Sequence, residues 1–352
     1  ALVIAGRSDL RFRGRVLYAC DVFQYTADSF AVLTAAAGPF FVTMPVVGLG
    51  QALLTGWATE FRSSAEPGQE AAQLLADHGL GRARIGIVGL SDAIAAAHLR
   101  QIEETLPAAE LCDATRLFET VRRRKSPEEV ANLRETSAIF RKIFAGFEPE
   151  IRPGTSEADI AGCAARGAKL HGCRDIKTAM GTSPFVAISY GSPRRVERDD
   201  QLMIWIETPG PNGYWLELRR CYSFGPPPDP VRRYFELQQE CWQVGLAAMR
   251  PGTTAGDVLA KVAVVLRRAG YGLSDGHFSL HGIGTDAIEG IWAPGNDGEL
   301  LDGEVVSFHP SVTFTDEAEA RQIRFIGMTD NVLVTPQGGV RLTYDTDRIV
   351  EL

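Results

Sequence analysis

The stretch RPGTSEADI, residues 152–160, recurs as RPGTTAGDV, residues 250–258, and this repeat decides the fold. In each copy a Pro-Gly turn is followed by a hydroxyl residue and, three positions later, by an aspartate that opens the next helix. Each copy lies between two helical patterns, and a β-rich, glycine-bearing region follows the second helix. The repeat therefore predicts two helix–helix–sheet halves related by a pseudo-twofold axis, with a ligand held between them.

A clear helix start lies just ahead of the repeated region. Ser126 precedes Pro127, Glu128 and Glu129. A capping hydroxyl, a proline at the first helical position and acidic residues in the first turn are the usual signals of a helix N-terminus. We therefore expect a long helix to begin there.

The part of the chain before this helix has a different organisation. Helical patterns alternate with β-like runs at residues 15–18, 40–43 and 85–88. Such alternation is typical of an α/β domain. We expect an N-terminal α/β domain at residues 1–124 and an α+β catalytic domain with the internal repeat at residues 125–352.

Composition limits the class of protein. The chain has 352 residues, 45% of them hydrophobic, and a formal net charge of −8. An acidic chain lacks the basic footprint that nucleic acid requires, and no apolar run approaches the roughly 20 residues that span a bilayer. The N-terminal residues do not form a signal peptide pattern, and the six cysteines include no CxxC pair. We expect a cytoplasmic protein with reduced thiols and no nucleic-acid or membrane partner.

Imidazoles and carboxylates in three separate segments suggest an active site. His277 and His281 lie four residues apart in a glycine-flanked segment, Glu207 and Glu217 flank an upstream turn, and His309 ends a downstream apolar run. Active sites are commonly assembled from polar groups of several strands, whereas a single histidine is often only a hydrogen-bonded core residue. The sequence thus favours a site built by these five side chains.

Further motifs in the second half form a recognisable combination. They are KSPEE at residues 125–129, the two Pro-Gly-Thr turns, GY at 213–214 ahead of Glu217 and Arg220, HxxxHGIG at 277–284, GEVVS at 303–307 and DNVLVT at 330–335. This combination resembles the creatinase, aminopeptidase P and methionine aminopeptidase superfamily. The resemblance implies a pita-bread C-terminal domain, a creatinase-like N-terminal α/β domain, and a homodimer.

The metal-ligand set of that superfamily is altered in this chain. Its peptidases hold two divalent metals with two aspartates, one histidine and two glutamates. The first four corresponding positions here carry Glu207, Glu217, His281 and His309, and the last lies close to Thr329. Replacing two glutamates by histidine and threonine removes two negative charges, so a two-metal site is not expected. A single Zn or Fe ion on the two glutamates and two histidines is the alternative.

Two further departures concern the chemistry. The second catalytic histidine of the peptidases falls on Ile288, and residues 188–193, where creatinase has its base, contain no histidine. We therefore expect a metal-independent enzyme without a cofactor, and not an aminopeptidase. It would cleave a C–N or neighbouring C–X bond of a small polar substrate, by hydrolysis or as a lyase.

In this hypothesis histidines carry the acid–base chemistry, because a free imidazole titrates near neutral pH. His281 would transfer the proton, with His309 and His277 as its partners. The expected substrate-binding residues are Glu207, Glu217, Arg219, Arg220, Tyr190 and Tyr214. An ion pair between Glu217 and one of the two arginines is an open structural alternative.

Two other functions stay open at this stage. One is a mononuclear-metal hydrolase or lyase related to Xaa-Pro peptidases. The other is a non-catalytic pita-bread module that binds a ligand. Retention of several buried polar groups argues against the binding module, because such groups are costly to bury.

Overall fold

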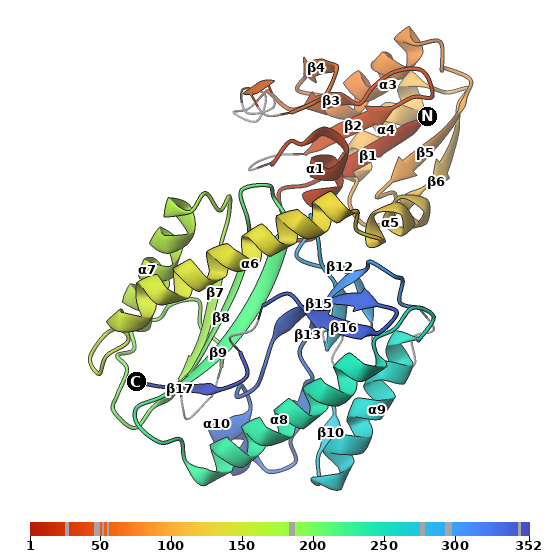
Figure 1. Cartoon of the computed structure of the whole chain (residues 1–352). Coiled ribbons are helices and arrows are strands. Elements are labelled where there is room, and N and C mark those ends of the chain that lie inside the picture. Colours follow the sequence, from red (N-terminus) through yellow and green to blue (C-terminus); the bar gives the residue numbers. More distant parts are fainter. Residues whose placement is uncertain are drawn as a thin grey trace. The chain divides into compact units, whose positions relative to one another are not determined.

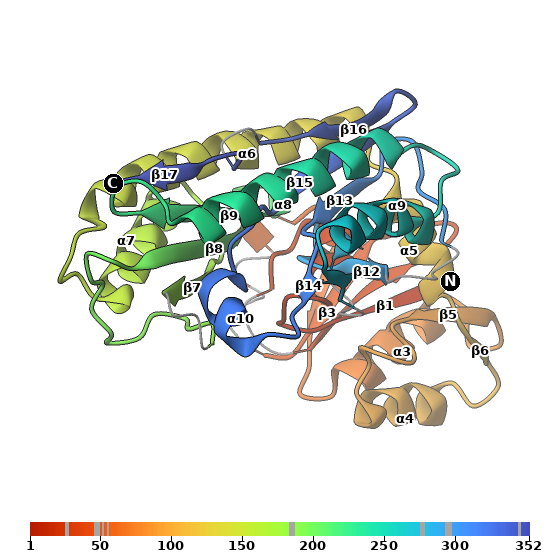
Figure 2. The ribbon, with the colours of Figure 1, turned by 90° about the horizontal axis from the view of Figure 1, so that it is seen from below.

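The computed structural model describes residues 1–24, 28–45, 50, 53–54, 56–182, 187–274, 279–292, 298–343 and 346–352. The chain divides into two compact units, Ala1–Arg122 and Arg123–Leu352. Figure 1 and Figure 2 show the elements of each unit from two directions. None of the helices in these described ranges is long and apolar enough to cross a membrane.

The first unit is an α/β/α sandwich. Its described strands form one mixed sheet of order β4-β3-β2-β1-β5-β6. The strands are β1 (Leu2–Gly6), β2 (Ser29–Leu33), β3 (Phe40–Thr43), β4 (Glu60–Ser63), β5 (Arg84–Val88) and β6 (Glu110–Asp113). The helices are α1 (Gly14–Cys20), α3 (Pro67–Asp77), α4 (Ala96–Thr105) and α5 (Thr115–Arg123). Val3 packs with α3 and α4 whereas Ile4 packs with α1 and α5, because successive strand residues point to opposite faces.

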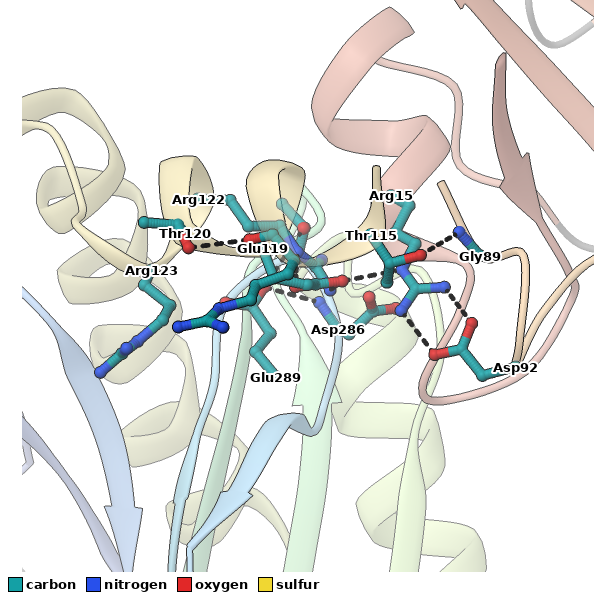
Figure 3. A network of polar contacts seen from close by, with 12 residues as sticks. Arg15, Gly89, Asp92, Thr115, Glu119, Thr120, Arg122, Arg123, Asp286 and Glu289 are labelled. Atoms are coloured by element: carbon teal, nitrogen blue, oxygen red, sulfur yellow. Dashed lines mark hydrogen bonds and ion pairs between the residues drawn. The ribbon is translucent and has the colours of Figure 1, made fainter. Parts of the chain in front are cut away.

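The prediction of a strand at residues 15–18 is wrong, because these residues lie in helix α1. A short apolar run does not distinguish a buried strand from a buried helix by its pattern alone. The side chain of Arg15 lies between two carboxylates. Its Nη1 donates to Asp92 and its Nε donates to Glu119, both at 2.8 Å. Nearby, the Gly89 amide donates to the Thr115 hydroxyl, as Figure 3 shows. Contacts with distant residues therefore stabilise the helix.

The second unit contains two larger sheets and the remaining helices. The sheet orders are β17-β9-β8-β7 and β12-β11-β13-β15-β16, and β10 pairs with β14. The helices are α6 (Pro127–Phe147), η1 (Glu148–Glu150), α7 (Glu157–Leu170), α8 (Asp229–Ala248), α9 (Ala255–Arg268) and α10 (Glu317–Ile323). The strands are β7 (Lys177–Thr182), β8 (Gln201–Pro209), β9 (Trp215–Ser223), β10 (Gly272–Leu273), β11 (Leu280–Gly282), β12 (Glu289–Trp292), β13 (Val305–Phe308), β14 (Val312–Thr313), β15 (Asp330–Thr335), β16 (Gly338–Arg341) and β17 (Ile349–Glu351).

The helix starts expected from the sequence are confirmed. The Ser126 hydroxyl accepts the Glu129 amide, and the Glu129 side chain accepts the Ser126 amide, which makes a capping box at the start of α6. Ser156 forms the same box at α7, and the Thr254 hydroxyl accepts an amide at the start of α9. Both copies of the repeated motif therefore begin a helix in the same way, since each places a hydroxyl over unpaired amides.

The long helices of the second unit pack against its strands. Helices α6 and α7 lie along β7–β9, and α8 lies along β16 (Figure 1). The ring of Phe308 on β13 packs against Trp242 of α8, at 4.8 Å between ring centroids. Residues that alternate with Phe308 on β13, such as Ser307, therefore point to the opposite face of the sheet. That opposite face carries the polar residues of the candidate site.

A buried carboxylate joins α7 to the loop after β7. Glu157 accepts hydroxyl hydrogen bonds from Thr182, Ser189 and Ser192, at 2.5 to 3.0 Å. Burial alone would raise the pKa of Glu157, but these hydroxyl donors outweigh it and lower the pKa. The carboxylate therefore remains charged and stabilises this loop at neutral pH.

Candidate metal centre

Three strands of the sheet β17-β9-β8-β7 carry charged residues on one face. Lys177 of β7 pairs with Glu207 of β8, and Glu207 pairs with Glu217 of β9. Directly opposed residues of antiparallel strands have Cβ atoms about 5 Å apart and point to the same side. Glu217 is therefore within reach of Glu207, although the two carboxylates have different partners.

The second sheet contributes two imidazoles to the same place. His281 on β11 is paired with Ser307 of β13, and His309 lies two residues beyond Ser307. His281 Nε2 lies 3.1 Å and His309 Nε2 3.4 Å from Glu217 Oε1. All three residues are buried. The structure thus brings together three of the five residues that the sequence selected.

Surrounding hydrogen bonds fix the carboxylate of Glu217. The Ser307 hydroxyl donates to Oε1, and Trp205 Nε1 donates to Oε2 at 3.0 Å. Asn331 holds the backbone of the same residue, since its Nδ2 donates to the Glu217 carbonyl at 2.7 Å. The side chain therefore has one orientation, set by both sheets.

The imidazole of His281 is also oriented by a hydrogen bond. Its Nδ1 donates to the Gly282 carbonyl at 3.0 Å, so Nε2 is the nitrogen that faces Glu217. A ring N–H on a backbone carbonyl is the usual arrangement behind a histidine that binds a metal. His309 Nε2 is buried and makes no hydrogen bond with the described residues.

Charges within the group perturb one another. Burial alone would raise the pKa of Glu217, but the imidazoles of His309 and His281 hold it well below its usual value. Burial would lower the pKa of His281, yet the hydrogen bond and charge of Glu217 raise it. Burial lowers the pKa of His309, which favours a neutral imidazole with a lone pair for binding.

Glu217, His281 and His309 fit a single metal ion. One ligand atom from each lies within 4.8 Å of the others. Around a tetrahedral ion with ligands at about 2.0–2.1 Å, neighbouring ligand atoms are about 3.3 Å apart. The distances of 3.1 and 3.4 Å to Glu217 Oε1 match that spacing. Two imidazoles and one carboxylate are donors that suit Zn or Fe, and the unsatisfied His309 nitrogen needs such a partner.

Glu207 does not join this group, because a lysine holds it. Lys177 Nζ donates to Glu207 Oε1 at 2.7 Å. Burial, followed by the nearby charge of Glu217, raises the pKa of Glu207, and Lys177 only partly opposes this. Glu207 is therefore not a fourth ligand beside Glu217, His281 and His309. The sequence analysis did not identify Lys177 as the partner of Glu207.

The remaining predicted residues fall into two groups. Arg219 lies on the same face as Glu217, and its guanidinium stacks over the Trp205 ring at 4.6 Å from the centroid. Arg220 points to the other face, where Nη1 donates to Glu148 at 2.5 Å. The alternation of the strand separates the two arginines. Neither arginine forms the ion pair with Glu217 that was the open alternative, since within the described ranges the basic groups beside its carboxylate are the two imidazoles.

The two tyrosines expected to bind substrate lie in different surroundings. The Tyr214 hydroxyl donates to Glu129 of α6 at 3.2 Å. Tyr190 is 69% exposed, and its ring centroid lies 5.8 Å from Lys177 Nζ. His277 lies outside the described residues. Ser307 and Trp205, which sequence reasoning did not select, contact Glu217 directly.

Comparison with known proteins identifies a family and its fold. The model of metallopeptidase family M24 matches residues 131–336. A probable dipeptidase PepE of Mycobacterium tuberculosis is 28% identical over 97% of this chain and 92% of its own length. A Xaa-Pro dipeptidase of Lactobacillus helveticus is 26% identical over 74% of this chain and 71% of its own length.

Solved structures confirm the predicted fold class. An X-Pro aminopeptidase of Thermotoga maritima covers the whole chain with a TM-score of 0.85 at 18% identity, over 95% of its own length. The dipeptidase PepE of Mycobacterium ulcerans covers 99% of the chain with a TM-score of 0.76 at 23% identity, over 92% of its own length. The expected fold, an N-terminal α/β domain followed by a pita-bread C-terminal domain, is therefore confirmed. The match to the family model confirms the expected superfamily.

The functional expectation is wrong. A metal-independent, creatinase-like enzyme or lyase that is not an aminopeptidase conflicts with a metallopeptidase family and with relatives named as dipeptidases. The error came from treating the loss of two glutamates as the loss of all metal binding. In the folded chain Glu217, His281 and His309 still converge on one point. The mononuclear alternative agrees better with these findings.

Proposed function

The chain belongs to metallopeptidase family M24, and we propose that it is a metal-dependent peptidase that hydrolyses short peptides at one metal ion. Glu217, His281 and His309 would hold that ion. The observation that carries the proposal is their convergence, at ligand-like spacing, in a buried site. When bound, a divalent cation supplies Lewis-acid polarisation of the peptide carbonyl and activates water for attack.

The protein supplies orientation around that ion. Ser307 and Trp205 fix the Glu217 carboxylate, and the Gly282 carbonyl fixes the tautomer of His281. Such outer hydrogen bonds reduce the reorganisation needed for binding and are commonly worth 10- to 100-fold in metal affinity. They support a role for the three residues as ligands.

We assign the proton transfer to Glu207. Its carboxylate pairs across the strands with Glu217, and its pKa is raised by burial and by that neighbouring charge. A carboxylate with a raised pKa can take a proton from water and give it to the leaving amine. Lys177, at 2.7 Å, keeps the ionised form of Glu207 accessible.

Elemental analysis and peptide hydrolysis together test the proposal. The full chain, loaded with zinc, manganese or cobalt and dialysed, should retain about one metal per chain and cleave dipeptides. His281→Ala and His309→Ala should each lose bound metal, and a chelator should abolish cleavage by the unmodified chain. If both variants retained the metal, His281 and His309 would not be its ligands. Cleavage that survives complete metal removal would exclude a metal-dependent mechanism.

A cytoplasmic homodimer is the setting that we propose for this activity. The six cysteines form no disulfide, which suits a reducing compartment. The superfamily resemblance supports a dimer. Light scattering at micromolar concentration should give about twice the chain mass of 38.2 kDa, and the mass of one chain would refute the dimer.

A further inference from the structure

The side-chain amide of Asn331 links the two large sheets of the second unit. Its Nδ2 donates to the Glu217 carbonyl at 2.7 Å, and its Oδ1 accepts the Glu217 amide at 3.3 Å. Within the described ranges, β9 and β15 form one isolated antiparallel bridge, between Arg219 and Thr329. In that register Glu217 faces Asn331. The buried asparagine amide therefore continues the pairing of the two strands beyond their backbone bridge.

Asn331 belongs to a row of side chains that all contact Glu217. His281 of β11 pairs with Ser307 of β13, and Ser307 pairs with Asn331 of β15. Directly opposed residues of antiparallel strands point to the same side of the sheet. The imidazole and the hydroxyl reach the carboxylate of Glu217, whereas the amide holds its backbone. The row therefore fixes both the backbone and the carboxylate of Glu217 relative to the imidazole.

An ion pair supports Asn331 from the opposite face of the sheet. The Asp330 carboxylate accepts the backbone amide of Asn331 at 2.6 Å and Nε of Arg341 at 2.8 Å. The Thr343 hydroxyl donates to the same carboxylate. Asp330 pairs with Phe308, whose ring packs on α8, so this group lies on the side away from the candidate metal centre. The peptide unit between Asp330 and Asn331 is thus held from both faces.

The guanidinium of Arg341 keeps the Asp330 carboxylate charged. Asp330 is completely buried, and burial raises its pKa to about 6, although the charge and hydrogen bond of Arg341 oppose the rise. Removal of the guanidinium therefore favours the protonated acid at neutral pH. A protonated carboxyl group is a weaker acceptor than a carboxylate for the Asn331 amide. Loss of Arg341 should loosen the backbone at Asn331.

We propose that Asn331 positions Glu217 as a metal ligand. The Asp330–Arg341 pair supports Asn331 from the opposite face of the sheet. This inference rests on the proposed metal centre and identifies residues that set its affinity without touching the ion. The distances of 3.1 and 3.4 Å from Glu217 Oε1 to the two imidazoles depend on how β9 lies against the second sheet. Residues that hold a ligand in place strengthen metal binding, because less reorganisation is needed.

The zinc affinity of the full chain tests the positioning role. The zinc Kd is measured by competition with a chromophoric chelator, and the Tm of each metal-free variant is recorded beside it. Asn331→Leu keeps the side-chain volume and removes both hydrogen bonds to Glu217, so it should weaken zinc binding about 10- to 100-fold. Arg341→Gln should weaken it about 10-fold from the far face of the sheet. The visible spectrum of the cobalt-loaded chain should change in both variants.

Further variants separate this role from general destabilisation. If Arg341 acts through Asn331, the double variant should bind zinc no more weakly than Asn331→Leu alone. Thr343→Val removes one hydrogen bond without a change of charge; it should also weaken zinc binding, and it takes the place of the larger substitutions if they prevent folding. Arg194→Gln is the matched control, because it removes a guanidinium from another buried carboxylate, Asp200. It should lower the Tm and leave the zinc Kd unchanged.

A signal from the metal-free chain reports on Glu217 directly. Trp205 Nε1 donates to Glu217 Oε2 at 3.0 Å, so the indole N–H resonance of Trp205 depends on where the carboxylate lies. This resonance is assigned in proton–nitrogen NMR spectra with Trp205→Phe. It should move in Asn331→Leu and in Arg341→Gln, and it should stay in place in Arg194→Gln.

The outcomes separate the positioning role from the proposed function. Unchanged zinc affinity in Asn331→Leu and Arg341→Gln, or losses that add in the double variant, would overturn the positioning role even if the unmodified chain cleaves peptides. If the unmodified chain binds no metal, the peptidase proposal fails and the indole resonance decides. Its movement in both variants then supports the positioning of Glu217, and an unmoved resonance overturns it.

Discussion

Replacing Lys177 by methionine should destabilise the second unit through Glu207. Lys177 Nζ lies 2.7 Å from Glu207 Oε1, and the lysine side chain is 31% exposed whereas that of Glu207 is 9% exposed. Methionine keeps most of the aliphatic volume but removes the ammonium, so a buried carboxylate then faces Glu217 without its cation. Removing one partner of a fully buried pair costs about 3–5 kcal/mol, and partial exposure of the lysine reduces our expectation to about 2 kcal/mol.

Differential scanning calorimetry measures this effect as a change in Tm. For a unit of this size, 1 kcal/mol corresponds to about 2–4 °C, so Lys177→Met should lower the Tm by about 4–8 °C. Glu207→Gln in the same background should recover most of the loss, because a neutral amide has no charge to compensate. The double-mutant cycle then gives a coupling of about 2 kcal/mol between the two side chains.

One pattern of Tm values would exclude a charge interaction between Lys177 and Glu207. If Lys177→Met and the double variant have the same Tm as each other, the lysine acts through packing and not through the charge of Glu207. The acid–base role assigned to Glu207 would then lose the support of its ion pair. Arg232→Met, on the exposed face of α8, is a suitable control, because exposed ion pairs contribute about 0–1 kcal/mol.

Three further predictions follow from individual contacts. Ser307→Ala should weaken zinc binding about 10-fold, measured by competition with a chelator, because Glu217 loses the hydroxyl that orients it; unchanged affinity would contradict this. Since the folded-state pKa of Glu157 is lowered, its contribution to stability is present above about pH 4.5 and lost as the pH falls through the folded value. The Glu157→Gln variant should therefore be less stable at pH 7 and lose less stability on acidification, and parallel pH curves of unfolding free energy would refute the assignment. Gly245→Ala should destabilise by about 2 kcal/mol, because its Cβ would lie 2.6 Å from the buried Phe308 ring; an unchanged Tm would show that the ring can move.

Local patterns in the sequence were sufficient for much of the fold. Hydroxyl caps before α6, α7 and α9 could be recognised without coordinates, because capping depends on residues only three positions apart. The repeated motif therefore indicated two similar halves. The same approach failed at residues 15–18, where the helix is stabilised by the ion pairs of Arg15 with two residues far along the chain.

The candidate site was only partly accessible in the same way. His281, His309 and Glu217 could be selected because histidine and glutamate in apolar strands are unusual and need a reason. That these three side chains lie together could not be predicted from the sequence. Their proximity depends on the pairing of His281 with Ser307 and on the approach of β9 to β15. The distance between two side chains on different sheets is not written in any local pattern.

Local residue patterns indicated the family resemblance, the repeated architecture and the residue types available for chemistry. Folding of distant segments brings particular residues together. Lys177 pairs with Glu207, Arg219 shares a face with Glu217 whereas Arg220 does not, and two imidazoles lie beside one carboxylate. The physical reason is that propensity and capping act over one or two helical turns. Charge pairing and metal binding instead depend on distances of 3–4 Å, which are set only when strands from both halves pack.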